Sequence, residues 1–127
     1  MIRWEDLQEI SASGNDIGSH TRTHKRLSDI SGDFKVLKNE IIGSKDEIEL
    51  QLGIECKYIS WPYGRLTDKD KISIDMVQDA GYKACFGAYR GTIVPGETAV
   101  YSIPRHQVEL HWPIAHIEYF ARGNMEL

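Results

Sequence analysis

Short apolar runs alternate with helical stripes along this chain, and no other feature constrains its fold as strongly. The longest stripe has apolar residues at spacings of three, four and seven, namely Phe34, Leu37, Ile41, Ile48 and Leu52. This periodicity predicts a helix, and Gly53 follows it as a usual C-terminal stop. A short apolar run at 56–59 then predicts a strand. Strands and helices in regular succession predict an α/β fold, with a parallel sheet and helices packed outside it.

The same patterns place the remaining elements. We expect further helices over 4–10, 68–80 and 113–122, the second capped by Thr67 or Asp68, and further strands over 15–19, 83–87 and 99–103. Ile72 and Met76 are expected to face inward from the second of these helices. Segment 90–98 carries two glycines and a proline, so it is predicted to be a loop.

Length and charge favour one domain over residues 1–127. A chain of 127 residues buries roughly two-thirds of its unfolded surface, which suits a single core. The net charge of −4 and the scattering of fifteen Lys and Arg residues argue against a nucleic-acid partner. No apolar run is long enough to span a bilayer, and no signal segment is recognisable. The sequence therefore predicts no membrane span and assigns no cellular compartment.

His20 and His24 stand four residues apart, directly after the strand expected at 15–19. This spacing lets both rings converge on one cation, either across a helical turn or in a loop that curls back. A divalent ion such as zinc would then need one more protein ligand, commonly a carboxylate, and would keep a position open for water. The alternative is that both histidines are only solvated polar groups. Asp16 is not expected to be the third ligand, because strand alternation groups it with Gly18.

A second loop follows the strand expected at 56–59. It reads Trp-Pro-Tyr-Gly at 61–64, where Pro62 fixes the backbone and Gly64 permits a tight path, so that Tyr63 is held outward. Trp61 is expected either to stack on a bound ligand or to pack in the core.

Three segments together resemble the polysaccharide deacetylase family, the carbohydrate esterases with a NodB-homology domain. They are His-Thr-Arg-Thr-His at 20–24 followed by Leu27, Trp-Pro-Tyr-Gly at 61–64, and Ala-Gly-Tyr-Lys-Ala at 80–84. The first resembles the family's metal motif and the second its groove motif. The resemblance implies a distorted (β/α) barrel, and it extends from about Trp4 to about Gly123.

Two parts of the family pattern are not found in this sequence. The family has a paired-aspartate motif on an earlier strand, which supplies the third metal ligand and the base, and nothing here resembles it. We therefore expect a partial barrel that lacks its first strands, with an exposed sheet edge that promotes self-association unless the chain is a fragment of a longer product. The family's arginine two positions before the proline is Ser60 here, and Arg105 is a candidate replacement to hold a carboxylate.

The resemblance also implies roles for individual residues. His20 and His24 would bind a divalent metal, most readily zinc, with cobalt or nickel as alternatives. The amide of Tyr63 would stabilise the oxyanion. The general acid would be one of three histidines, His106, His111 and His116, the last of which lies in a spacing similar to the family's Leu-x-His motif.

The function implied is metal-dependent removal of acetyl groups from N-acetylated sugars of a carbohydrate polymer, impaired in the chain as given. The alternative is a degenerate, non-catalytic member that binds carbohydrate or has a structural role. Members of the family are often extracellular or on the cell surface. Cys56 and Cys85 are far apart in the sequence and each lies in an expected strand, so two reduced core thiols are predicted.

Overall fold

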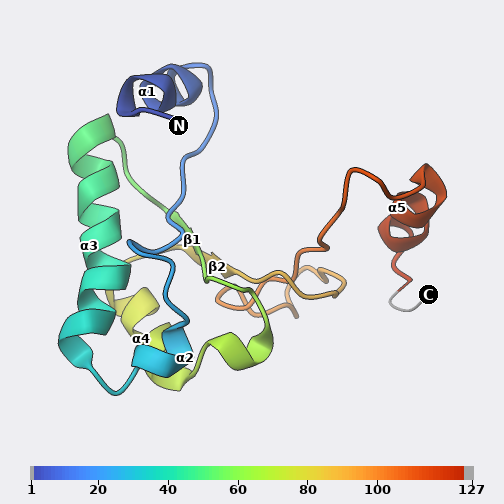
Figure 1. The fold of residues 1–127 in the computed structure, drawn as a ribbon. Coiled ribbons are helices and arrows are strands. Elements are labelled where there is room, and N and C mark those ends of the chain that lie inside the picture. The colour runs from blue at the N-terminus through green and yellow to red at the C-terminus, as the bar shows by residue number, and fades with distance from the viewer. Residues whose placement is uncertain (1, 125–127) are drawn as a thin grey trace.

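A short parallel sheet lies at the centre of the computed structural model, which describes residues 2–124 (Figure 1). Strand β1 (Tyr58–Ser60) pairs in parallel with β2 (Ala84–Phe86), in a register that sets Ile59 opposite Cys85. Single parallel bridges extend this pair on both sides, from Ser19 to Ile59 and from Phe86 to Ile103. The four extended segments therefore all run in one direction, which confirms the α/β prediction. The strands expected at 15–19 and 99–103 are each reduced to one bridging residue.

The helices follow one another in the predicted order, with two short additions, over 27–30 and 66–68. They are α1 (Trp4–Ala12), α2 (Leu27–Ile30), α3 (Phe34–Leu52), the 3-10 turn η1 (Leu66–Asp68), α4 (Lys71–Asp79) and α5 (Ile114–Ala121). Figure 1 shows α1 above the end of α3, α4 beneath the sheet, and α5 on an arm that extends away from the rest. Helix α2 was not expected from the sequence, because one helical turn carries no periodicity.

Capping residues explain where the two packed helices begin and end. The Asp33 carboxylate accepts hydrogen bonds from the amides of Lys35 and Val36 at the start of α3, and Gly53 ends this helix with a left-handed φ of 66°. Asp70 caps α4, so the expected caps Thr67 and Asp68 were wrong. Those two residues belong to η1 instead.

The core lies between the sheet and helices α3 and α4. Its buried members are Leu27, Leu37, Ile41, Cys56, Ile59, Trp61, Met76, Val77, Tyr82 and Cys85. Met76 faces inward as predicted, whereas Ile72, in the first turn of α4, is 55% exposed, so the expectation for Ile72 was wrong. None of the helices within residues 2–124 is long and apolar enough to cross a membrane.

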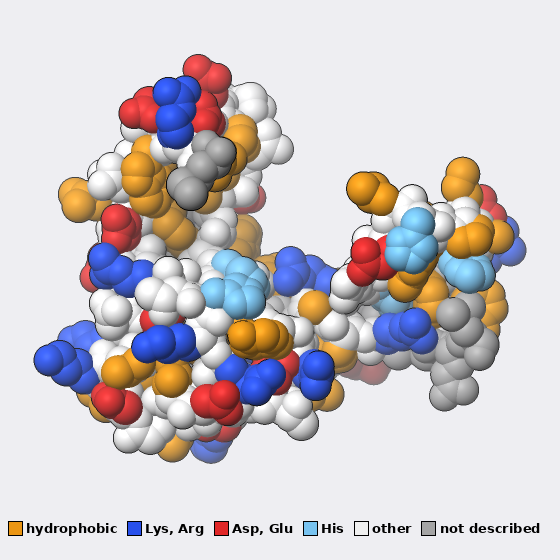
Figure 2. All heavy atoms as spheres, in the orientation of Figure 1, with side chains coloured by type: hydrophobic (Ala, Val, Ile, Leu, Met, Phe, Trp, Pro, Cys, Tyr) orange, Lys and Arg blue, Asp and Glu red, His pale blue; other side chains and the backbone are white. Residues whose placement is uncertain are grey.

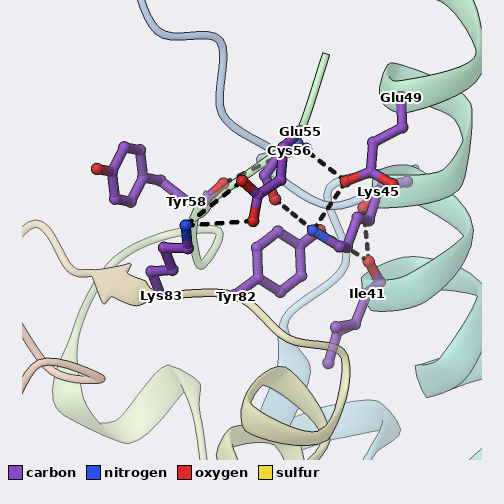
Figure 3. Close-up of polar contacts among 9 residues, drawn as sticks. Ile41, Lys45, Glu49, Glu55, Cys56, Tyr58, Tyr82 and Lys83 are labelled. Atoms are coloured by element: carbon purple, nitrogen blue, oxygen red, sulfur yellow. Dashed lines mark hydrogen bonds and ion pairs between the residues drawn. The ribbon is translucent and has the colours of Figure 1, made fainter. Parts of the chain in front are cut away.

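Lys45 joins helix α3 to the start of the sheet (Figure 3). Its ammonium donates to the Cys56 carbonyl, pairs with the Glu49 carboxylate at 3.0 Å and lies 4.8 Å from the centre of the Tyr82 ring. Glu49 in turn accepts the Cys56 amide at 2.9 Å, and the Tyr82 hydroxyl donates to the Ile41 carbonyl at 3.0 Å. These bonds fix the position of α3 relative to β1. This position matters because α3 also carries Glu40, a buried residue that shapes the site described below.

Both cysteines are predicted to resist alkylation in the folded protein. Cys56 and Cys85 are free and buried, and burial raises both thiol pKa values, that of Cys85 to about 12. Because these pKa values are raised, the neutral thiols favour the folded state below the unfolded pKa of about 8.5, and this contribution is lost as pH rises through the folded pKa. Iodoacetamide near neutral pH should label neither thiol in buffer and both in denaturant, as counted by mass spectrometry. Rapid labelling in buffer would contradict this burial.

Candidate functional site

The first part of the site is the loop that leaves the bridge at Ser19 and carries both histidines. Two of its residues have left-handed backbones, Thr21 with φ 63° and His24 with φ 60°. Each such residue costs roughly 1–2 kcal/mol when it is not glycine, so the surrounding contacts must impose this shape. As a result the rings of His20 and His24 lie edge to face, with their centres 4.9 Å apart. The loop therefore brings the two histidines together, as their spacing predicted.

A buried carboxylate on α3 imposes the shape of this loop. Glu40 is 1% exposed and accepts hydrogen bonds from the amides of Arg22 at 3.1 Å and Thr23 at 2.8 Å, and a third from the Thr23 hydroxyl. Burial is the largest influence on the pKa of Glu40 and raises it, but the hydrogen bonds from Thr23 and Arg22 outweigh burial and hold the pKa below its usual value. An ionised carboxylate beneath the loop thus replaces the hydrogen bonds that its amides would make with water.

The end of strand β1 orients the ring of His20. Its Nδ1 lies 2.9 Å from the carbonyl oxygen of Ser60 and 2.8 Å from the Ser60 hydroxyl. A carbonyl oxygen can only accept a hydrogen bond, so a neutral His20 ring that bonds this carbonyl has its proton on Nδ1 and a lone pair on Nε2. A backbone carbonyl that fixes the tautomer in this way is the usual partner of a metal-binding histidine.

The second loop follows β1 and lies against the first. Tyr63 is 53% exposed and left-handed, with φ 65°, and its ring centre is 5.1 Å from that of His24. Gly64 has φ 78°, and a Cβ at this position would lie 2.4 Å from the Ala88 Cβ. The Ala88 amide also donates to the Gly64 carbonyl at 2.9 Å. Glycine is therefore required here, and the expectation that Tyr63 is held outward agrees with the structure.

Trp61 does not line the site. Its side chain is 1% exposed, its indole nitrogen donates to the Arg65 carbonyl at 2.9 Å, and its ring stacks on Tyr89 with centres 6.2 Å apart. Of the two alternatives expected for Trp61, core packing agrees with the structure, because a ring buried in this way does not reach a ligand.

A groove of about 300 Å³ runs beside His20 over one face of the sheet. Ser60, Phe86, Arg105 and Asp16 are among the residues that line it. The Nε of Arg105 donates to the Gly87 carbonyl at 2.8 Å, and its guanidinium lies 5.6 Å from the centre of the Phe86 ring. The structure thus brings Arg105 into the groove that contains His20 and Ser60. Asp16 also reaches this groove, because positions 16, 18 and 20 share one face of the extended chain.

The two imidazoles fit a divalent metal as part of its ligand set. They converge, and the tautomer of His20 leaves Nε2 able to bind a cation. Catalytic zinc sites usually have three protein ligands. Within residues 2–124, however, no group of three or more His, Cys, Asp or Glu side chains is placed to hold a metal, so Asp16 does not complete the set.

The sequence profile of the polysaccharide deacetylase family matches residues 2–85. This chain belongs to that family. No curated protein sequence matches it significantly. Among solved structures, the deacetylase PplD of Streptococcus pyogenes, in complex with acetate, has a TM-score of 0.80 at 21% identity. A polysaccharide deacetylase from Bacillus cereus has a TM-score of 0.76 at 19% identity, and a de-N-acetylase from Aggregatibacter actinomycetemcomitans has 0.70 at 17%.

These likenesses concern the fold, and they span only part of each relative. The superposition with the Streptococcus deacetylase covers 99% of this chain and 51% of that protein. The corresponding shares are 94% of this chain and 36% of the Bacillus protein, and 94% of this chain and 53% of the Aggregatibacter protein. The chain thus spans between about a third and a half of the deacetylases it resembles. The prediction of a partial barrel of the deacetylase type is confirmed at this level.

The three histidines expected as candidate general acids lie away from the histidine pair. His106 stacks on Phe120 with ring centres 5.3 Å apart. His116, on helix α5, lies edge to face with Trp112, and the centres of these two rings are 6.4 Å apart. His111 is exposed in the turn before that helix. None of these three lines the groove beside His20. Figure 2 shows histidine side chains at two separate places, on the body of the protein and on the arm that carries α5.

Glu40 is the residue of this site that sequence reasoning missed. It occupies the inward face of α3 between Leu37 and Ile41, where an acidic residue interrupts an apolar stripe. That interruption was the available signal, because a charged side chain in a buried stripe needs a partner.

We predict that Glu40→Gln destabilises the folded protein by about 1–3 kcal/mol, since a neutral amide cannot accept the same three hydrogen bonds. The pKa of Glu40 is lowered in the folded state, so its stabilising effect is present above the unfolded pKa of about 4.5 and is lost as pH falls through the folded value. Urea denaturation of both proteins should show a difference at neutral pH that shrinks at acidic pH.

Glu47→Gln is the control for this experiment. Glu47 lies on the same helix and pairs with Arg22 at 3.0 Å, but its side chain is 39% exposed. An exposed pair of this kind contributes about 0–1 kcal/mol. Equal effects of the two substitutions would show that Glu40 has no special role in the loop.

Proposed function

We propose that this chain carries the histidine half of a metal-dependent polysaccharide deacetylase that hydrolyses acetyl groups from N-acetylated sugars. The observation that carries the proposal is the convergence of His20 and His24, with the Nδ1 of His20 held by the Ser60 carbonyl and the Tyr63 loop against His24. Family membership supports the reaction class. The substrate is then an acetylated carbohydrate polymer.

A divalent metal, most readily zinc and alternatively cobalt or nickel, would be bound by His20 and His24. Its third protein ligand would come from outside residues 2–124, either from a further segment of the complete protein or from a second copy that pairs through the sheet edge. When bound, the ion supplies two effects: it polarises the acetyl carbonyl and lowers the pKa of a water molecule.

The remaining groups of this chain act on the substrate. Hydrolysis adds water to the acetyl carbon and breaks its bond to the sugar nitrogen, so acetate leaves and the amine takes up a proton. Negative charge develops on the acetyl oxygen, where the amide of Tyr63 would donate a hydrogen bond. Arg105, anchored by Gly87 in the groove of His20, would hold a carboxylate by a paired hydrogen bond. None of the candidate acids, His106, His111 and His116, lines this groove, so we assign the donor of the amine proton to none of them in this arrangement.

A non-catalytic role is the second candidate, and one observation favours it. The part of the chain that the structure describes offers no third metal ligand. A member without that ligand would keep the groove beside His20 and bind carbohydrate without hydrolysing it. The same observation leads us to propose that the chain by itself has impaired activity.

The proposed metal site predicts how the chain binds divalent ions. Titration calorimetry with Zn²⁺ or Co²⁺ should show one weak site per chain, in the micromolar range or weaker because one ligand is missing. His20→Ala or His24→Ala should weaken binding at least tenfold, since even the loss of a group that only orients a metal ligand costs about 10–100-fold. His111→Ala, on the exposed turn, should leave the affinity unchanged.

Sedimentation velocity with and without metal identifies the source of the third ligand. Metal-induced dimerisation supports a ligand from a second copy, and a monomer at every metal concentration supports a further segment of the protein. Equal affinities for the wild type and both histidine variants would contradict the site.

The proposed function also predicts a weak activity of the chain. Acetate release from N-acetylglucosamine oligomers should be slow, should stop when metal is chelated, and should be lost in His20→Ala and in His24→Ala. Oligomer binding measured by NMR without any acetate release, with or without metal, would support the non-catalytic alternative. Release that persists after chelation would contradict the proposed mechanism.

A further inference from the structure

The guanidinium of Arg26 lies between the two loops of the site. Arg26 comes two residues after His24 and directly before helix α2. Its Nε lies 2.9 Å from the Asp68 carboxylate in η1, and its central carbon lies 4.6 Å from the centre of the Tyr63 ring. One side chain from the histidine loop thus contacts two residues of the segment that follows β1.

Asp68 gives this guanidinium a fixed position. It is 2% exposed, and its second carboxylate oxygen accepts the Arg65 amide at 2.9 Å. A carboxylate held by the backbone attracts the guanidinium, whose central carbon lies over the face of the tyrosine ring. The Nε of Arg26 approaches Asp68 without hydrogen-bond geometry, and its Nη1 lies 3.6 Å from the Asp29 carboxylate, so charge attraction to two carboxylates holds the guanidinium in place.

Tyr63 needs an external restraint to keep its backbone shape. Its φ of 65° is unfavourable for a residue with a side chain. Its ring is 53% exposed, so core packing does not hold it. The described contacts to this ring are Arg26 over its face and His24 beside it. Gly64 fixes the next residue through Ala88 but does not contact the ring.

We propose that Arg26 is a positioning residue of the deacetylase, which holds the Tyr63 backbone in its left-handed conformation against His24 through the ion pair with Asp68 and the stack on the Tyr63 ring. This inference rests on the proposed function, because it assigns Arg26 to the placement of the amide that would stabilise the oxyanion. Neither contact of Arg26 involves the metal ligands directly. Loss of Arg26 should therefore affect the chemical step more than the binding of substrate or metal.

The experiment compares Arg26→Lys, Arg26→Gln and Lys25→Gln in the labelled chain by NMR. The Cα and Cβ chemical shifts of Tyr63 report its left-handed backbone, and a nuclear Overhauser contact reports its ring beside His24. Both Arg26 variants should lose this signature and this contact. Arg26→Lys keeps the charge. Loss of the Tyr63 signature in this variant would therefore show that the planar guanidinium over the ring is needed, and not charge alone.

Lys25→Gln is the matched control. It removes one positive charge, as Arg26→Gln does, but from the neighbouring residue, which is exposed. It should leave the Tyr63 signals unchanged. If Arg26→Gln unfolds the protein, Arg26→Lys and Asp68→Asn decide the question, since Asp68→Asn weakens the ion pair without changing its shape. Unchanged Tyr63 shifts in a folded Arg26→Lys protein would overturn the proposal.

A kinetic arm uses acetate release by the active protein. Arg26→Lys should lower kcat about tenfold while KM changes less than twofold, because a small misplacement of a catalytic group costs up to about a hundredfold in rate. A change in KM alone would overturn the positioning role. Absence of activity in the wild type would contradict the proposed function but would leave the NMR comparison able to decide whether Arg26 holds Tyr63.

Discussion

The site depends on one buried interaction, the acceptance of loop hydrogen bonds by the carboxylate of Glu40. This carboxylate is on the middle of α3, and α3 is fixed against the sheet by Lys45. The position of the histidine loop is therefore set by a helix that contributes no ligand. A buried charge is tolerated only when its hydrogen-bonding capacity is filled, and here the amides of Arg22 and Thr23 fill it. The same bonds that make the charge tolerable also define the loop.

Backbone strain gathers at this site and not elsewhere in the described chain. The non-glycine residues with a positive φ are Thr21, His24 and Tyr63, and all three lie in the two loops. Strained residues persist where the surroundings determine them more strongly than their own preferences. The groups that do so here come from α3, from η1 and from the end of β1. The two loops are thus shaped by elements that the sequence separates widely.

This dependence explains which parts of the molecule could be predicted from sequence. Helix α3 was found with its bounds, because a long apolar stripe and a following glycine are local signals. The strand expected at 15–19 is reduced to a single bridge, because strand pairing depends on neighbours that the local pattern does not report. The pairing of His20 with His24 followed from their spacing and the family motif. The burial of Trp61 and the bridge made by Arg26 depend on tertiary contacts, and no local pattern encodes them. The acidic residue in the apolar stripe of α3 signals a buried charge at Glu40, but the loop that it binds follows only from the tertiary fold.

The state of the histidine pair has a physical consequence for how a metal would bind. In most flexible sites, part of the binding free energy is used to order the ligands. Here the rings already converge, and the contacts of Nδ1 with Ser60 already orient the His20 ring. The ordering cost for these two ligands is therefore small. The affinity and the chemistry would then be decided by the ligand that residues 2–124 do not supply, since a third, anionic donor sets both the charge of the site and the acidity of the bound water.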